Sequence, residues 1–247
     1  ESFLNTLMIL HVHQPISGNK IASLSCSGGE ASLIADLAEQ FNFRFPKLSS
    51  KQKRKLKSAL GDLVHLSNPL DYQTYVWSDQ VKLTMAFKTM MEETYDFLFI
   101  IMDLPKQGRC SSDSWHPAIA ALKEAKKIAK CPVGLITSLE ENMPEKFAKD
   151  LIKHSIIPLT GLENSLAAVK ALQNVSIRWK VKSTPSIIWE RWPNEKSRVL
   201  DEYQSKKVLS RIGINVPRGF VITDKNSLLN KFRSISKAVC LKAIGIN

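Results

Sequence analysis

The residues best suited to chemistry lie in one short loop, Ser25–Ala31 (SCSGGEA). An apolar segment with strand character precedes it, and apolar residues at helical spacing follow it. Gly28 and Gly29 allow an anion to approach the backbone closely. The first turn of the following helix offers free N–H groups and a partial positive charge, which suit a phosphate. The loop is neither G-x-G-x-x-G nor a P-loop with its lysine, so a tight structural turn is an equally good interpretation.

Cys26 occupies the same loop, where a helix N-terminus would lower the pKa of a thiol and make it reactive. The alternative is a small apolar residue without chemistry. The other cysteines stand far apart, at Cys110, Cys131 and Cys240. Without a C-x-x-C pair, a zinc site or a disulfide framework is not expected, and a reducing cytoplasm is the predicted location.

Five apolar segments with strand character alternate with helical patterns. The segments are 20–26, 43–48, 95–102, 132–137 and 156–159. Helical spacing covers 2–13, 30–41, 49–60, 78–91, 113–128, 144–154 and 161–175. This alternation predicts an α/β fold, a doubly wound five-stranded parallel sheet with helices on both faces. Ligands of such folds lie beyond the carboxyl ends of the strands. Three loops are therefore of interest, those after Cys26, around Asn68 and after Met102.

The alternation of strand and helix segments stops near residue 176 and restarts near residue 200. Residues 176–199 lack a regular period and contain two prolines, as in a linker. Beyond them we expect a helix at 200–212, a strand at 218–223, a helix at 224–236 and a strand at 238–243. The predicted domains are 1–175 and 200–247. About fifty residues cannot bury a robust core alone, so we expect the second domain to be poorly packed, or to pack against the first domain or another copy of the chain.

The charge balance is strongly basic, with 35 lysines and arginines against 23 acidic residues. Nucleic acid, a membrane surface, a polyphosphate ligand and a simple solvated surface are all compatible with it. The densest basic run, Lys51–Lys57, has no interleaved aromatic residues, which argues against a nucleic-acid partner. The sequence has no run of eighteen apolar residues, so no membrane span is predicted.

Two blocks of sequence resemble one enzyme superfamily. S-x-S-G-G-E-A-x-x-x-A-D at 25–36, followed by S-N-P-L-D at 67–71, resembles the CoA-ligase domain of succinyl-CoA synthetases and ADP-forming acyl-CoA synthetases. The segments LDEYQSKKVL (200–209), GINVP (213–217) and VCLKA (239–243) resemble the start of the ATP-grasp domain of that superfamily. The resemblance implies a flavodoxin-like sheet of the succinyl-CoA synthetase type, followed by the N-terminal part of an ATP-grasp domain.

The resemblance also implies a function. Members make acyl-CoA from a carboxylic acid, CoA and ATP, through an acyl phosphate and a phosphohistidine, and release ADP and phosphate. ATP, CoA and Mg²⁺ are then the expected cofactors of the intact enzyme, an acid–thiol ligase. The implied phosphate-binding residues are Ser27, Gly28, Gly29 and Glu30. Asn68 and Asp71 would lie in a substrate loop, and Lys242 would contact ATP phosphate, where a compact ammonium charge is apt.

The nucleophilic histidine of the superfamily follows a strand in a small-residue context. No histidine of this chain stands in such a context, neither His11, His13, His65, His116 nor His154. We therefore expect no catalytic residue here, a histidine in an upstream domain of the same polypeptide, and no activity from the chain alone. The expected partners are CoA, a nucleotide, a carboxylic acid and the remaining domains, and a homo-oligomer is compatible. The alternative is a regulatory or protein-acetyltransferase-associated domain of the same architecture.

Overall fold

The structure, a computed structural model, describes residues 1–106, 108–181, 199–233, 235 and 238–244. The chain divides into two compact units, Glu1–Thr184 and Pro185–Asn247. Of the predicted linker, residues 176–179 belong to the last helix of the first unit, and residues 182–198 lie outside the described residues. The predicted domain boundaries stay a prediction.

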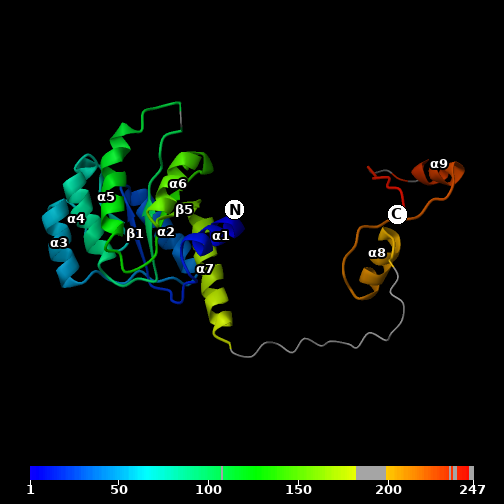
Figure 1. Cartoon of the computed structure of the whole chain (residues 1–247), viewed down its shortest axis with the longest axis horizontal. Coiled ribbons are helices and arrows are strands. Elements are labelled where there is room, and N and C mark those ends of the chain that lie inside the picture. Colours follow the sequence, from blue (N-terminus) through cyan, green and yellow to red (C-terminus); the bar gives the residue numbers. More distant parts are fainter. Residues whose placement is uncertain (107, 182–198, 234, 236–237, 245–247) are drawn as a thin grey trace. The chain divides into compact units, whose positions relative to one another are not determined.

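A five-stranded parallel sheet forms the centre of the first unit (Figure 1). Its strands are β1 (Ile21–Ser25), β2 (Leu70–Asp71), β3 (Phe97–Ile101), β4 (Val133–Thr137) and β5 (Ile157–Thr160). Their spatial order is β2-β1-β3-β4-β5, and every neighbouring pair is parallel. The predicted α/β fold with a five-stranded parallel sheet is confirmed. The order reverses between β1 and β3, which is where open parallel sheets of this kind bind ligands.

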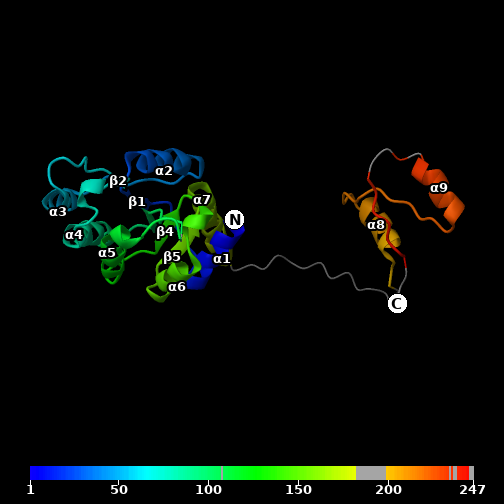
Figure 2. The same cartoon turned by 90° about the horizontal axis from the view of Figure 1, so that it is seen from above.

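Helices cover both faces of the sheet (Figure 2). One face packs against α3 (Ser50–Leu60), α4 (Gln80–Met91) and α5 (His116–Lys126). The other packs against α1 (Ser2–Val12), α2 (Gly28–Gln40) and α7 (Leu162–Trp179). The unit also contains α6 (Glu145–Lys153) and the 3-10 helices η1 (Thr74–Val76), η2 (Asp113–Trp115) and η3 (Glu140–Asn142).

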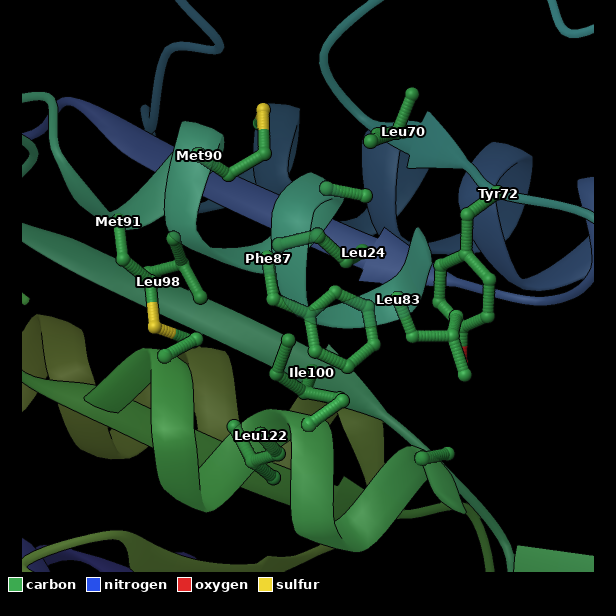
Figure 3. Close-up of a cluster of buried hydrophobic side chains, with 14 of the residues drawn as sticks. Leu24, Leu70, Tyr72, Leu83, Phe87, Met90, Met91, Leu98, Ile100 and Leu122 are labelled. Atoms are coloured by element: carbon green, nitrogen blue, oxygen red, sulfur yellow. The ribbon is translucent and has the colours of Figure 1, made fainter. Parts of the chain in front are cut away.

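Burial follows from the alternation of side chains along each strand. Leu98 and Ile100 of β3 face α4 and α5, whereas Phe97 and Phe99 face the opposite layer. Figure 3 shows Phe87 of α4 among the residues of the first layer, and its ring meets the Tyr72 ring edge-on with centroids 5.3 Å apart. Both faces of the central strand are therefore inside the core, as an all-parallel sheet requires.

The predicted second strand at 43–48 is wrong. Only Arg44 contributes there, through one isolated parallel bridge to Lys20. Pro46 cannot donate to a ladder, so pairing does not continue past it. The second strand is β2, which lies in the segment expected to be the loop around Asn68.

The second unit contains α8 (Glu202–Arg211) and α9 (Lys225–Arg233). The strands predicted at 218–223 and 238–243 are wrong, because neither described segment pairs with another strand. No described residue from 199 onward is buried, and Phe220, Phe232 and Leu241 are all exposed. The expectation of poor packing in this unit is confirmed. None of the described helices is long and apolar enough to cross a membrane.

Candidate functional site

The candidate site begins where β1 ends and α2 begins. Ser27 is the N-cap residue of α2, in an extended backbone conformation, and the Ser25 hydroxyl donates to its carbonyl oxygen over 3.0 Å. The same carbonyl accepts the first helical hydrogen bond, from the Ala31 N–H over 3.1 Å. Among the described residues, no hydrogen bond uses the N–H groups of Gly28, Gly29 or Glu30. The free N–H groups of the first turn are therefore those of Gly28, Gly29 and Glu30, whereas the Ala31 N–H is used within the helix.

The two glycines of this turn differ in their surroundings. A Cβ atom on Gly28 would stand 3.3 Å from Oδ2 of Asp71, which is a tight contact. A Cβ atom on Gly29 would meet nothing closer than the Ser27 hydroxyl, at 3.5 Å. Gly28 therefore permits the approach of Asp71, whereas Gly29 is exposed and keeps the outer side of the turn open.

Two aspartates flank the turn, at the ends of the strands on either side of β1. Oδ1 of Asp71 accepts from the Gln73 backbone N–H (2.9 Å), and its Oδ2 accepts from the Gln73 side-chain amide (2.6 Å). Asp103, just after β3, accepts from the Ser138 N–H (2.7 Å) and the Asn142 side chain (3.0 Å). Both aspartate side chains are therefore fixed in place by protein donors on their own side of the site.

Glu30 lies in the first turn of α2, near both aspartates, and has no such donors. Its Oε2 is buried and has no hydrogen-bond partner. Burial, followed by the negative charges of Asp103 and then Asp71, raises the pKa of Glu30 to about 7. A cluster of three carboxyl groups therefore includes one that retains a proton near neutral pH.

Two further groups near this cluster stay neutral. Burial and the nearby Glu30 raise the pKa of the Cys26 thiol to about 11. The hypothesis of a reactive thiolate is wrong, because burial and carboxylates outweigh the helix terminus. Burial, together with Cys26, Glu30 and Asp71, also raises the pKa of Tyr72 well above its usual value. The Tyr72 hydroxyl is fully buried and has no hydrogen-bond partner.

The Asn68 side chain is held by backbone groups, and its predicted place in a substrate loop stays a prediction. Its side-chain amide donates to the carbonyl oxygens of Ile21 (3.1 Å) and Pro46 (3.2 Å). Its oxygen accepts from the Ser23 N–H over 3.2 Å. Both amide hydrogens are thus used within the protein. The structure brings Asp71 to the start of α2 but engages Asn68 with the backbone of β1.

Lys242 belongs to the second unit, where its exposed side chain lies 3.3 Å from Oε1 of Glu202. A contact with ATP phosphate stays a prediction. Among the described residues there is no group of three or more His, Cys, Asp or Glu side chains that could hold a metal ion. The Mg²⁺ expected for the intact enzyme stays a prediction.

Sequence reasoning missed Asp103 and Tyr72 as members of the cluster. The loop after Met102 was selected because it follows a buried strand, and Asp103 is its first residue. Tyr72 gave no signal of its own. It directly follows β2, and its ring packs against Trp77 and Phe87.

Comparison with known proteins was made at the level of sequence and of structure. No family model matches the chain. The acetate–CoA ligase (ADP-forming) of Methanocaldococcus jannaschii is 23% identical over 254 residues, which cover 97% of this chain. Trans-feruloyl-CoA synthase FCS1, from an unknown prokaryotic organism, is 22% identical over 92% of the chain. The resemblance to ADP-forming acyl-CoA synthetases is confirmed.

Two solved structures share the fold of the first unit. PH0766 of Pyrococcus horikoshii OT3 superposes with a TM-score of 0.59 and 21% identity, over 73% of this chain and 41% of its own. The dinucleotide-forming acetyl-coenzyme A synthetase 1 of Ca. Korarchaeum cryptofilum gives 0.53 and 16%, over 71% and 37%. The chain spans about a third of the length of the two curated synthetases, 35% and 32% respectively.

Proposed function

We propose that this chain is the part of an ADP-forming acyl-CoA synthetase that receives the phosphoryl group during acyl transfer. The observation that carries the proposal is the first turn of α2. Three backbone N–H groups without partners lie there, at the carboxyl end of β1, where the strand order reverses. Such a turn binds phosphate through its N–H groups and through the helix dipole.

In the intact enzyme, ATP would supply the phosphoryl group and CoA the thiol that accepts the acyl group. Gly28, Gly29 and Glu30 would orient phosphoryl oxygens through their N–H groups. The Korarchaeum synthetase, whose sheet resembles this one, has been solved with phosphate and ADP, which supports a phosphoryl site in this fold. Lys242 would contact the ATP phosphate from the second unit, as the predicted start of an ATP-grasp domain. The cytoplasm is the proposed location.

The test uses the full-length protein that contains this chain. Incubation with ATP, CoA and a panel of carboxylic acids, with acetate and ferulate first, should consume thiol and release ADP. Labelled phosphohistidine should form from labelled ATP. A folded full-length protein that binds acyl-CoA without forming either product would reject the ligase and favour a regulatory domain.

Gly29→Val addresses the phosphate site directly. A valine there meets little of the protein, so the fold should survive, but the branched side chain obstructs the open side of the turn. Phosphohistidine formation should fall at least about tenfold, which corresponds to about 1.4 kcal/mol. Ser32→Val, also exposed on α2, is the matched control for placing a valine in this helix and should keep wild-type labelling. Wild-type labelling of Gly29→Val would reject the assignment.

A further inference from the structure

The outer surface of the layer formed by α3, α4 and α5 lies on the side of the sheet opposite to α2 (Figure 2). Ion pairs connect the three helices across this surface. The Lys55 amine of α3 lies 2.6 Å from a carboxylate oxygen of Glu92, which directly follows α4. The Lys88 amine of α4 lies 3.0 Å from a carboxylate oxygen of Glu124 in α5. The outward side chains of these helices therefore form one continuous surface, which we call the outer face. The outer face comprises Lys51, Arg54, Lys55, Val81, Met85, Lys88, Glu92, Glu124, Lys127 and Lys130.

Positive charge dominates the outer face. Helix α3 carries five basic residues and no acidic one, and Lys51, Arg54 and Lys55 lie on one side of it at helical spacing. The pKa of Glu92 is lowered first by the hydrogen bond from Lys55. The charges of Lys51 and Lys130 lower it further, so both amines lie near this glutamate. Both glutamates of the outer face are paired with lysines, whereas Lys51, Arg54 and Lys130 form no ion pair among the described residues and leave a surplus of positive charge.

Two apolar side chains are exposed on the outer face. Val81 is 70% exposed and Met85 is 45% exposed. They lie on one side of α4 with Lys88 and Glu92, because residues three or four apart on a helix are neighbours. The ion pairs that Lys88 and Glu92 form with α5 and α3 place this side of α4 outward, between the two flanking helices. Apolar and basic side chains are therefore neighbours on the outer face.

Two kinds of polyanion attract such a surface, a nucleic acid and an anionic lipid bilayer. Nucleic-acid binding relies on charge and on aromatic rings on which bases stack. None of the residues of the outer face is aromatic, and phosphates gain nothing from Val81 or Met85. A bilayer uses both kinds of side chain, because amines meet its anionic headgroups and apolar groups enter the boundary with the acyl chains. The combination therefore favours the bilayer.

We propose that the outer face binds an anionic lipid bilayer, with its lysines and Arg54 at the headgroups and with Val81 and Met85 at the boundary with the acyl chains. Binding of this kind lies on the membrane surface and requires no helix that spans it. The net charge of +12 adds long-range attraction to the anionic surface. The proposal does not depend on the ligase function, since α2 and its phosphate site belong to the opposite layer.

The experiment measures sedimentation of the full-length protein that contains this chain with lipid vesicles. The vesicles consist of phosphatidylcholine alone or of phosphatidylcholine with about 30% phosphatidylserine. The protein should sediment with the anionic vesicles and not with the neutral ones, and about 0.5 M NaCl should release it because salt screens the attraction. Binding to neither kind of vesicle, or equal binding to both, would overturn the proposal.

A triple variant tests the charge of the outer face. Lys51→Gln, Arg54→Gln and Lys130→Gln together should weaken binding to anionic vesicles about a hundredfold, because each basic residue near such a surface contributes about fivefold. All three side chains are exposed, so the fold should survive, and circular dichroism checks it.

The matched control removes the same charge from exposed positions outside this layer. It combines Lys20→Gln, Arg178→Gln and Lys180→Gln. Binding should change less than about threefold, because these charges lie beyond a Debye length from a bilayer on the outer face. Equal losses in the two triple variants would show that net charge alone attracts the vesicles, and would overturn the assignment to this face.

Val81→Ser together with Met85→Ser tests the apolar part and leaves the charge unchanged. Binding to anionic vesicles should weaken about tenfold, because less apolar surface leaves water. Duplex DNA is the rival ligand. Binding of duplex DNA without binding of anionic vesicles, unaffected by the two serines, would identify a nucleic-acid surface and overturn the proposal.

Discussion

The two units of this chain contain helices with similar sequence signals and very different packing. Helices α3 and α8 both begin with a side-chain cap and both carry apolar residues at helical spacing. Leu56 and Leu60 of α3 are buried against the sheet, whereas Val208 and Leu209 of α8 are exposed. Amphipathic spacing therefore predicts a helix but not a core. In the first unit, α3 is stabilised because its apolar face packs against the sheet.

The largest contrast should come from truncating one phenylalanine in each unit. Phe87 is fully buried against Tyr72, and Phe232 is 50% exposed. Phe87→Ala should lower the free energy of unfolding by about 3–5 kcal/mol, because it removes a large buried side chain and leaves a cavity. Phe232→Ala should change it by less than about 0.5 kcal/mol. Urea denaturation followed by circular dichroism measures both, and equal effects would contradict the contrast.

A smaller contrast concerns one glutamate in each unit. Burial raises the pKa of Glu30 to about 7 from its ordinary 4.5, so the folded state binds this proton more tightly than the unfolded chain does. The stability linked to this proton is fully present below about pH 4.5 and is lost as the pH rises through about 7. Because Glu30 is half-exposed, the loss should be only about 1–2 kcal/mol after solvent screening.

Glu30→Gln should remove that loss, so its unfolding free energy should fall less than that of the wild type between pH 5 and pH 8. Glu202→Gln is the counterpart in the second unit. Lys206 and Lys242 hold the pKa of exposed Glu202 below its usual value. This variant should follow the wild-type pH curve. A wild-type slope in Glu30→Gln would show that another group controls the pH dependence.

The smallest contrast concerns the two helix caps. Ser49 accepts from the Gln52 N–H over 3.2 Å in a capping box at the start of α3. Asp201 accepts from the Gln204 N–H over 2.7 Å at the start of α8. Ser49→Ala should cost about 1 kcal/mol of global stability. Asp201→Ala should leave the main unfolding transition unchanged and reduce only hydrogen-exchange protection in α8, because α8 buries no side chain.

Much of the fold was predictable because its signals are local. The caps at Ser49 and Asp79 lie within one turn of the helices they start. The strands around Ile21, Phe97 and Val133 are buried at every position and consist mostly of apolar residues. β2 was not predictable, because two residues display no period and its pairing depends on β1, far away in sequence.

The site was predictable only in part, for a related reason. The glycine turn and Asp71 stand in recognisable segments and meet in space. Donors to Asp71 and Asp103 come from two separate connections, Gln73 after β2 and Ser138 and Asn142 after β4. That Glu30 has no donor at Oε2 is a property of the assembled cluster, and no spacing along the chain encodes it.

The Asn68 side chain also covers an edge of the sheet that could otherwise promote aggregation. β2 has only two residues and pairs only with Leu24 and Ser25 of β1. The backbone groups of Ile21 and Ser23 on the same edge of β1 would therefore be unpaired. The Asn68 side-chain amide donates to the Ile21 carbonyl oxygen and accepts from the Ser23 N–H. The Ile21 N–H donates to the backbone carbonyl oxygen of Arg44. An exposed edge of this kind recruits strands from other molecules and promotes aggregation. The Asn68 amide and the Arg44 carbonyl together close this edge against a foreign strand, and Asn68→Leu should aggregate during refolding even where the native fold forms.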